Sequence, residues 1–421
     1  MKLVYIVSWL FALAVSFVSC DDWLDKTPKD RLYPDVYFKT EDELRLFTNQ
    51  FYNNLVPSAV DIYSESSDLI VKSDLMLEMS GQRIIPDEGN GWNFTALRDI
   101  NFYLQYSHNC TEVNARNRYD GVARFFRAYF YFEKVKRYGD IPWYDKALDS
   151  DDPELYKARD SREFVMQKML EDLDFAIANL PKTKNAYVLT RWTALALKSR
   201  VCLFEGTFRK YHGLEDYEKY LNACVSASET FMNESGYTLY KSGSTPYRDL
   251  FASINLQADE VIFGRDYEAS LSVLHNVQNY ENSTTMGRPG MNKKIVNSYL
   301  MADGSRFTDK AGYETMTFDQ ECQNRDPRLA QTIRTPGYTR IGSTKKEAPN
   351  LAYTMTGYHL IKYSMTANYD EYNKSCNDIP LFRTAEVYLN FAEAKAELGT
   401  LKQADINKSI KLLRSEERRV G

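Results

Sequence analysis

The sequence has no large excess of charge of either sign. Its 421 residues include 53 lysines and arginines against 58 aspartates and glutamates, which gives a net charge of −5. A surface with this balance offers no general attraction for nucleic acid or for an anionic membrane. Only 19 glycines and 13 prolines are present, so collagen-like and low-complexity chains are excluded as well.

Histidine and cysteine are also scarce, and neither forms a metal-binding pattern. The four histidines are scattered singly and no two cysteines have C-x-x-C spacing, so we expect no zinc site and no cofactor. Each histidine is expected to be a surface or hydrogen-bonded side chain. Cys202 and Cys224 fall in helix-like segments and are expected to be buried, whereas the sequence leaves open whether any of Cys110, Cys202, Cys224, Cys322 and Cys376 form disulfides.

Motifs of common enzyme classes are absent from the sequence. It contains no G-x-S-x-G, no P-loop and no H-E-x-x-H. A glycoside hydrolase would need two carboxylates at a defined separation, and nothing in the pattern singles out one pair among the many acidic residues. We therefore expect a protein that is not an enzyme.

Aromatic residues are abundant: the chain has 31 tyrosines and 22 phenylalanines. Tyrosine suits half-buried surface, because its ring packs while its hydroxyl stays in water. Together with 43% hydrophobic residues, this composition predicts a folded chain with a sizeable core.

The first twenty residues have the layout of a bacterial lipoprotein signal. A positive start at Lys2 is followed by an apolar run from Leu3 to Val18 and then by Ser19 and Cys20. We expect cleavage before Cys20 and lipidation of Cys20, with an ordinary cleavage site and an incidental cysteine as the alternative. Residues 1–19 are thus predicted to be a signal peptide and residues 20–39 a lipidated tether.

Periodic apolar positions predict helices over residues 40–235. Thr40 and Glu43 form a capping box for a helix that runs to about residue 54. Asp120 is predicted to cap a helix that Gly139 ends, and Asp160 is predicted to start the next one. Further stripes at 3.6-residue spacing run through residues 194–208, 217–231 and 382–396. Helix pairs joined by short polar loops predict a mostly α fold, a tetratricopeptide-like array of helical hairpins.

Residues 236–413 are predicted to form a loop-rich α+β binding region followed by C-terminal helices. Helical periodicity fades after residue 235, and Glu260–Gly264 is a short strand-like run. Loops on a rigid scaffold often carry binding surfaces. Residues 414–421, RSEERRVG, resemble translated sequencing-adaptor sequence, so we expect a non-native tail on a chain that is incomplete at its C-terminus.

Several arginines are expected to serve the scaffold. Arg124 and Arg127 lie on one helix, where salt bridging is the simplest role. A turn around Pro327 should let Arg325, Asp326 and Arg328 pair with one another, and Arg383 with Glu386 have the i, i+3 spacing of a helical ion pair.

The order and spacing of many short motifs resemble the SusD/RagB family of outer-membrane nutrient-binding lipoproteins. These motifs are Cys20–Asp25 with Thr27-Pro28, Gly121–Phe132, Tyr138–Pro142, Glu171–Leu173, Leu180-Pro181, Ala194–Leu197, Arg200-Val201, Asp303-Gly304 with Arg306, Asn324–Leu329, Gly357-Tyr358, Lys362-Tyr363, Arg383–Glu386 and Ala392–Ala394.

The resemblance implies a helical fold with four tetratricopeptide-like hairpins and an oligosaccharide or related nutrient as ligand. It also implies a SusC-like TonB-dependent transporter as partner and attachment to the outer membrane through the lipid, facing the outside of the cell. The family also includes members that handle peptides, so a peptide-binding protein and a protein scaffold are kept as alternatives, with a glycoside hydrolase as a third.

A site for sugar should combine aromatic rings, which cover the C–H faces, with polar groups that bind the hydroxyls. Two loops offer this combination. The first loop supplies Asp87, Asn90 and Trp92, and the second supplies Tyr267, Tyr280, Asn282 and Arg288. These residues are the predicted ligand-binding set, with core packing as the alternative for Trp92 and an ordinary exposed tyrosine as the alternative for Tyr280.

Overall fold

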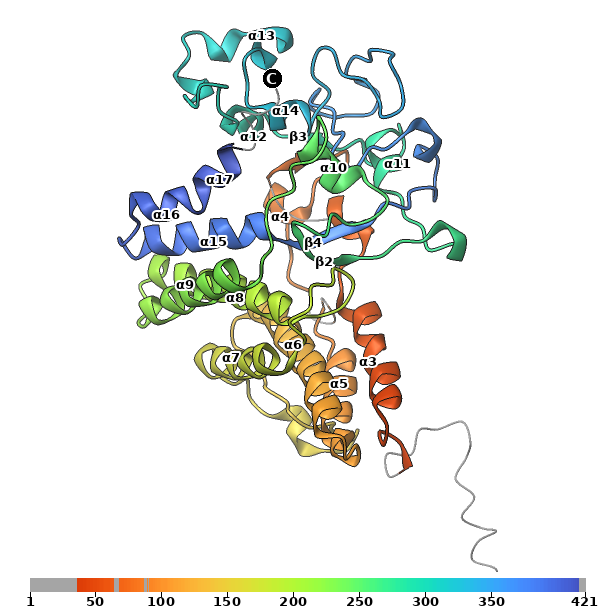
Figure 1. Cartoon of the computed structure of the whole chain (residues 1–421), viewed down its shortest axis with the longest axis vertical. Coiled ribbons are helices and arrows are strands. Elements are labelled where there is room, and N and C mark those ends of the chain that lie inside the picture. Colours follow the sequence, from red (N-terminus) through yellow and green to blue (C-terminus); the bar gives the residue numbers. More distant parts are fainter. Residues whose placement is uncertain (1–35, 64–67, 87–88, 90, 416–421) are drawn as a thin grey trace, which may run out of the picture.

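The computed structural model describes residues 36–63, 68–86, 89 and 91–415. The predicted signal peptide, Cys20 and most of the tether therefore lie outside the described residues, as do residues 416–421. The described chain has two halves, a stack of long helices and a loop-rich half above it in Figure 1. This architecture confirms the predicted mostly α fold.

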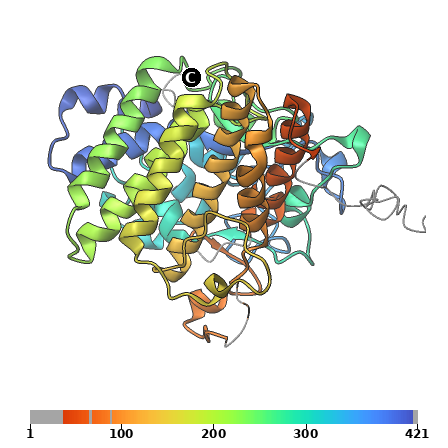
Figure 2. The same ribbon diagram turned by 90° about the horizontal axis from the view of Figure 1, so that it is seen from below.

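Six helices build most of the helical half, and Figure 2 shows them side by side in chain order. They are α3 (Glu41–Leu55), α5 (Thr95–Tyr106), α6 (Val113–Tyr138), α7 (Arg162–Asn179), α8 (Arg191–Tyr211) and α9 (Tyr217–Glu234). The pairs α6–α7 and α8–α9 pack as hairpins. Large apolar side chains from these helices, among them Phe126, Leu173, Leu197 and Phe231, share one buried core.

Helix termini agree with the sequence prediction in part. The capping box of α3 is present, since the Glu43 amide donates to Thr40 Oγ1 at 3.3 Å and the Thr40 amide donates to Glu43 Oε2 at 3.2 Å. The prediction that Asp120 starts a helix is wrong, because α6 begins two turns earlier, at Val113. Asp160 is not the cap of α7 either: Ser161 caps it, while Asp160 accepts from the Trp143 amide at 2.7 Å.

Short elements make up the loop-rich half and the C-terminal part. The helices are α4 (Leu77–Ser80), α10 (Pro246–Ala252), α11 (Val277–Glu281), α12 (Lys293–Ser298), α13 (Phe318–Cys322), α14 (Pro327–Ala330), α15 (Thr384–Glu397), α16 (Gln403–Asn407) and α17 (Ile410–Ser415). The strands are β1 (Ile70–Val71), β2 (Val261–Arg265), β3 (Gly290–Met291) and β4 (Ile379–Arg383). Strand β1 pairs with β3, and β2 pairs with β4, both antiparallel.

The ladder between β2 and β4 joins the two halves. Side chains of a strand point alternately to opposite faces. Accordingly, Val261 and Ile379 enter the core of the loop-rich half, whereas Ile262 and Phe382 enter the core of the helical half. The predicted strand at Glu260–Gly264 is thus confirmed, and it lies between two cores.

Helix α15 follows β4 directly and packs on α8 and α9. The expected ion pair between Arg383 and Glu386 is wrong, because each side chain has a different partner. Arg383 Nη1 binds buried Glu260 at 2.7 Å, and Glu386 accepts two hydrogen bonds from Arg200 of α8, at 2.5 and 2.7 Å. The predicted apolar stripe also includes Leu389, which is 48% exposed.

Cysteines and histidines behave largely as expected. Within the described residues every cysteine is free, and Cys202 and Cys224 are buried. His275 and His359 are buried and hydrogen-bonded. The Nε2 atom of His359 lies 2.7 Å from the Glu281 carbonyl, to which it donates, and its Nδ1 accepts from the Asn350 amide at 3.2 Å.

A buried ion pair joins α6 to α7. Arg127 donates to Asp172 through Nε at 2.6 Å and through Nη2 at 2.7 Å, and both side chains are less than a tenth exposed. Arg124 lies 3.6 Å from the same carboxylate, so the expected scaffold role of both arginines is confirmed. Such a pair is weak evidence of net stabilisation, but loss of one member leaves a buried charge without a partner.

Asp172→Ala should therefore lower the free energy of unfolding by about 3–5 kcal/mol, because Arg127 would remain buried without its carboxylate. Asp174→Ala is the matched control: Asp174 lies on the same helix and forms an exposed pair with Lys198. The control should lose less than about 1 kcal/mol. Urea unfolding followed by circular dichroism measures both, and equal losses would contradict a special role for the buried pair.

A second prediction concerns acid stability. Burial lowers the pKa of His359 from 6.5 to about 3, so the folded protein holds this imidazole neutral while the unfolded chain protonates it. The unfolded state then binds more protons below pH 6.5, and stability falls as the pH falls. His359→Gln, which removes the titration, should lose about 2 kcal/mol less than the parent between pH 7 and pH 5. Unfolding midpoints of both proteins at the two pH values decide this, and parallel losses would contradict it.

Candidate functional site

The predicted loop around Trp92 leads into α5. Gly89 and Gly91 both adopt positive φ, at 73° and 83°. A Cβ on Gly91 would lie 3.3 Å from Tyr138 Oη, so both the backbone conformation and the close approach favour glycine. The Trp92 amide donates to the Gly89 carbonyl at 3.0 Å, and the turn presents the indole at the surface, where it is 39% exposed.

Neighbouring aromatic rings hold the Trp92 indole in place. Its centroid is 5.3 Å from that of Phe94 and 4.9 Å from that of Tyr138, both edge-on. The guanidinium carbon of Arg159 lies 4.9 Å from the Trp92 ring centroid. The indole is therefore fixed by edge contacts and by one cation, yet part of it is open to solvent.

Trp92 also lines a cavity of about 300 Å³. The other lining residues combine rings, aliphatic groups and polar side chains: Phe94, Thr95, Leu97, Arg98, Asn101, Tyr144, Lys146, Leu148 and Leu155. A concave site with aromatic walls and a few polar groups is the usual form of a small-ligand site. The volume is at the low end of the usual range for such sites.

The rear wall of this cavity is tied to the buried ion pair. Asn101 donates through Nδ2 to the Tyr144 carbonyl at 2.8 Å, and its Oδ1 accepts from Arg127 Nη1 at 3.2 Å. Arg127 is in turn held by Asp172. The wall is therefore fixed before any ligand arrives, which reduces the entropy lost on binding.

Charged side chains surround the opening. Lys146 pairs with Glu154 at 2.9 Å, and Arg98 lies 4.0 Å from Asp149. Salt bridges as exposed as these contribute little to the free energy of folding. Their polar atoms can therefore exchange a protein partner for a polar group of a ligand at little net cost in free energy.

The second predicted loop is placed differently from expectation. Tyr267 is only 7% exposed; its hydroxyl accepts from the Ala59 amide at 2.8 Å, and its ring packs edge-on against His275. Asn282 is 8% exposed, and its Oδ1 accepts from both Arg334 and Arg340, at 2.9 and 3.0 Å. Both side chains therefore belong to the interior, and the structure does not present them at an open surface as the sequence prediction expects.

Two members of the second loop remain nearer the surface. Tyr280 is partly buried against the core of the loop-rich half. Arg288, which has a positive φ of 51°, donates through Nη2 to the Leu351 carbonyl at 2.9 Å. Neither lines the Trp92 cavity, so the structure does not bring the two predicted loops together into one pocket.

Asp87 and Asn90 lie outside the described residues. The residues that sequence reasoning missed come from the segment after α6, namely Tyr144, Lys146 and Arg159. In the sequence, the Tyr138–Pro142 motif lies just before these residues. It indicates a resemblance to the family, but nothing in it predicts that the segment lies beside Trp92.

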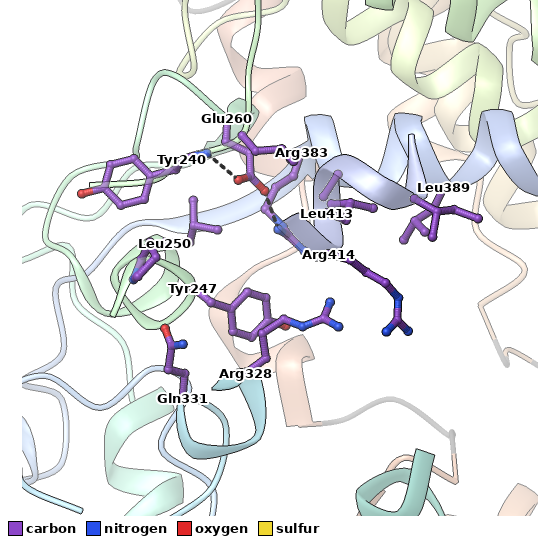
Figure 3. Close-up of a pocket in the computed structure, with 14 residues that line it drawn as sticks. Tyr240, Tyr247, Leu250, Glu260, Arg328, Gln331, Arg383, Leu389, Leu413 and Arg414 are labelled. Carbon is purple, nitrogen blue, oxygen red and sulfur yellow. Dashed lines mark hydrogen bonds and ion pairs between the residues drawn. The ribbon is translucent and has the colours of Figure 1, made fainter. Parts of the chain in front are cut away.

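A separate cavity around Tyr247 lies in the upper part of the molecule and is drawn in Figure 3. It shares no lining residue with the Trp92 cavity and contains none of the predicted site residues.

Comparison with known proteins agrees with this fold. A model described as the SusD family matches residues 250–418, and one described as "Starch-binding associating with outer membrane" matches residues 82–191. The second match spans the Trp92 loop, and the first spans the ladder partner β4 and helix α15.

Relatives and solved structures extend over most of the chain. SusD-like protein P2 of Formosa agariphila is 25% identical over 416 residues, covering 92% of this chain and 76% of the relative. A crystal structure of a SusD-like protein from Bacteroides fragilis covers 93% of this chain and 82% of its own, at 21% identity and a TM-score of 0.72. The structure of a SusD-like carbohydrate-binding protein from the same species covers 90% of this chain and 79% of its own chain, at 19% identity and a TM-score of 0.73. The two family models match successive parts of the chain, residues 82–191 and 250–418, and the relatives and solved structures cover nearly all of it. The chain belongs to the SusD/RagB family.

Proposed function

We propose that this protein binds an oligosaccharide nutrient without chemically altering it and delivers the ligand to a TonB-dependent transporter of the outer membrane. The observation that carries the proposal is the Trp92 indole, half-exposed and held at the edge of a preformed cavity. The matching family model is described as starch-binding, and one structural relative is a carbohydrate-binding protein, which supports the ligand class.

Sugar recognition fits the chemistry of this cavity. A sugar ring offers apolar C–H faces and several hydroxyls, and the cavity offers Trp92 and Phe94 beside Arg98, Lys146 and Thr95. An open site desolvates its ligand only in part, and each hydroxyl contact replaces one with water, so each adds little. We expect a dissociation constant in the micromolar to millimolar range, or about −8 to −4 kcal/mol.

Attachment to the membrane would come from the lipid on Cys20. No helix within the described ranges is both long and apolar enough to cross a bilayer. One matching family model is described as associating with the outer membrane. We place the protein on the outer face of that membrane, with the tether at residues 20–39 as its link and the transporter as its partner.

Replacing Trp92 with Ala should weaken glycan binding at least tenfold, because it removes the stacking face while leaving the apolar stripes of the helices intact. Trp92→Phe should keep part of the affinity. Calorimetry with maltoheptaose is the first experiment, chosen from the description of the matching family model, followed by a panel of other soluble oligosaccharides.

Tyr211→Ala is the control for a lost exposed ring, since Tyr211 is 69% exposed and does not line the cavity. It should bind as the parent does. Tyr280→Ala tests the second predicted loop. A larger loss of glycan affinity in Tyr280→Ala than in Trp92→Ala would place the site at the second loop instead. If no glycan of the panel binds but a peptide mixture does, the ligand class is wrong.

Cys20→Ala should abolish attachment of the chain to the membrane through a lipid. Without its thiol the chain cannot receive the lipid, so the variant should leave the membrane fraction or remain unprocessed. Fractionation of cells expressing the parent and the variant, with immunoblotting, measures this. Undiminished membrane retention of correctly cleaved Cys20→Ala would contradict lipid anchoring.

A further inference from the structure

The Trp92 cavity has an apolar rear wall. Four of the residues that line the cavity are less than a tenth exposed and form this wall: Leu97, Asn101, Tyr144 and Leu148. Leu97 and Leu148 are aliphatic, and most of the Tyr144 side chain is an aromatic ring. Trp92 and Phe94 continue the apolar lining towards the opening.

The amide of Asn101, which is the most polar group of the rear wall, has all its partners inside the protein. Its Nδ2 atom donates to the carbonyls of Tyr144 and Lys146, at 2.8 and 3.3 Å. Its Oδ1 atom accepts from Arg127 Nη1 at 3.2 Å. Both polar atoms of this side chain are therefore engaged before a ligand arrives.

The other polar atoms of the rear wall are engaged as well. The Tyr144 hydroxyl donates to the Leu155 carbonyl at 3.3 Å. The Leu148 carbonyl accepts from Arg98 Nε at 3.2 Å. A ligand hydroxyl that reaches this wall leaves water without gaining a hydrogen bond in return, and an unpaired buried hydroxyl weakens binding.

Groups that can pair with ligand hydroxyls lie at the opening instead. Thr95 is exposed, and its hydroxyl has no hydrogen bond within the described part of the chain. The side chains of Arg98 and Lys146 are about half exposed and take part only in surface ion pairs. The cavity is thus polar at its opening and apolar at its rear, so it favours a ligand with the same division.

The volume of about 300 Å³ is at the low end for a small-ligand site, so the cavity admits one sugar unit and not a run of units. We propose, on the basis of the proposed glycan function, that this unit is a 6-deoxy sugar. Its C6 methyl group packs against Leu97 and Leu148, while its ring hydroxyls stay at the opening beside Trp92.

A 6-deoxy sugar carries a methyl group where an ordinary hexose carries a hydroxymethyl group. Burial of the methyl group removes apolar surface from water, which favours binding. Burial of the hydroxymethyl group leaves a hydroxyl without a partner at the rear wall, which opposes binding. An acetamido group also ends in a methyl group, but its N–H and C=O would meet the same wall without partners.

Two pairs of methyl glycosides test this preference, because the members of each pair differ only at C6. They are the L-fucoside with the L-galactoside and the L-rhamnoside with the L-mannoside. In NMR titrations we expect the deoxy member of at least one pair to bind about tenfold tighter, or more, than its partner. The C6 methyl protons of that sugar should receive the strongest saturation transfer from the protein.

Methyl N-acetylglucosaminide and methyl glucoside form a third pair, which tests the acetamido group. Equal affinities within both deoxy pairs overturn the proposal. A preference confined to the acetamido pair overturns it as well.

Two variants test the role of the rear wall. Tyr144→Phe removes one oxygen and frees the Leu155 carbonyl to accept a hydrogen bond from the C6 hydroxyl. Leu148→Asn places an amide in the wall at similar side-chain volume. Each should raise the affinity of the C6-hydroxylated sugars and narrow the preference by about threefold or more.

Tyr156→Phe is the matched control, since Tyr156 is 85% exposed and does not line the cavity. It should keep the full preference for the deoxy sugar. Thermal unfolding shows whether each variant is folded. An unaltered preference in folded Tyr144→Phe and Leu148→Asn overturns the proposal.

Trp92→Ala separates this inference from the proposed function. It should weaken both members of a pair alike, because the indole offers a stacking face to any sugar. Sugar binding that depends on Trp92 but shows no preference at C6 overturns the inference alone. If no sugar binds, maltoheptaose included, the inference and the proposed function both fall.

Discussion

The bidentate pair between Arg127 and Asp172 is the contact on which the helical half and its cavity both depend. It fixes α6 against α7, and through Asn101 it reaches α5 and the carbonyls of the segment after α6. The guanidinium also lies over Trp143, whose ring stacks on Tyr131 at 4.3 Å. Apolar packing can slide by small amounts, whereas a buried pair with two short hydrogen bonds fixes one register. The wall behind Trp92 therefore takes its position from a charge pair deep in the stack.

The two halves are stabilised by different means. Helices bury regular apolar stripes, so most buried apolar side chains of the helical half belong to one large core, with a small second cluster where α8 and α9 meet α15. The loop-rich half has few regular elements, and its backbone and side-chain polar groups must find partners one by one. Buried Glu281 accepts from the Tyr363 amide at 3.2 Å and from the Ser364 hydroxyl at 2.5 Å, and Asn282 accepts from two arginines. These hydrogen-bond networks hold the loops in place, as periodic apolar packing holds the helices.

Sequence reasoning was most successful where structure is local. The α3 capping box and the end of α6 at Gly139 follow from neighbouring residues. Errors arose where a distant segment decided the outcome: Arg383 binds Glu260 across the ladder and not its helical neighbour Glu386. The exposure of the candidate site residues shows the same limit. The sequence places Trp92, Tyr267 and Asn282 alike in polar loops, but only the folded chain shows that Trp92 is exposed while Tyr267 and Asn282 are buried.

The ladder between β2 and β4 has a consequence for how the chain folds. The hairpins α6–α7 and α8–α9 form from segments adjacent in sequence, so they can assemble early and fast. Strand β4 is separated from β2 by the whole loop-rich half, and closing so long a loop carries an entropic penalty before the pairing can repay it. We therefore expect the ladder and α15 to dock late. Until they do, the apolar surfaces of α8 and α9 that α15 covers stay open to solvent, which makes the partly folded chain prone to aggregate and dependent on chaperones.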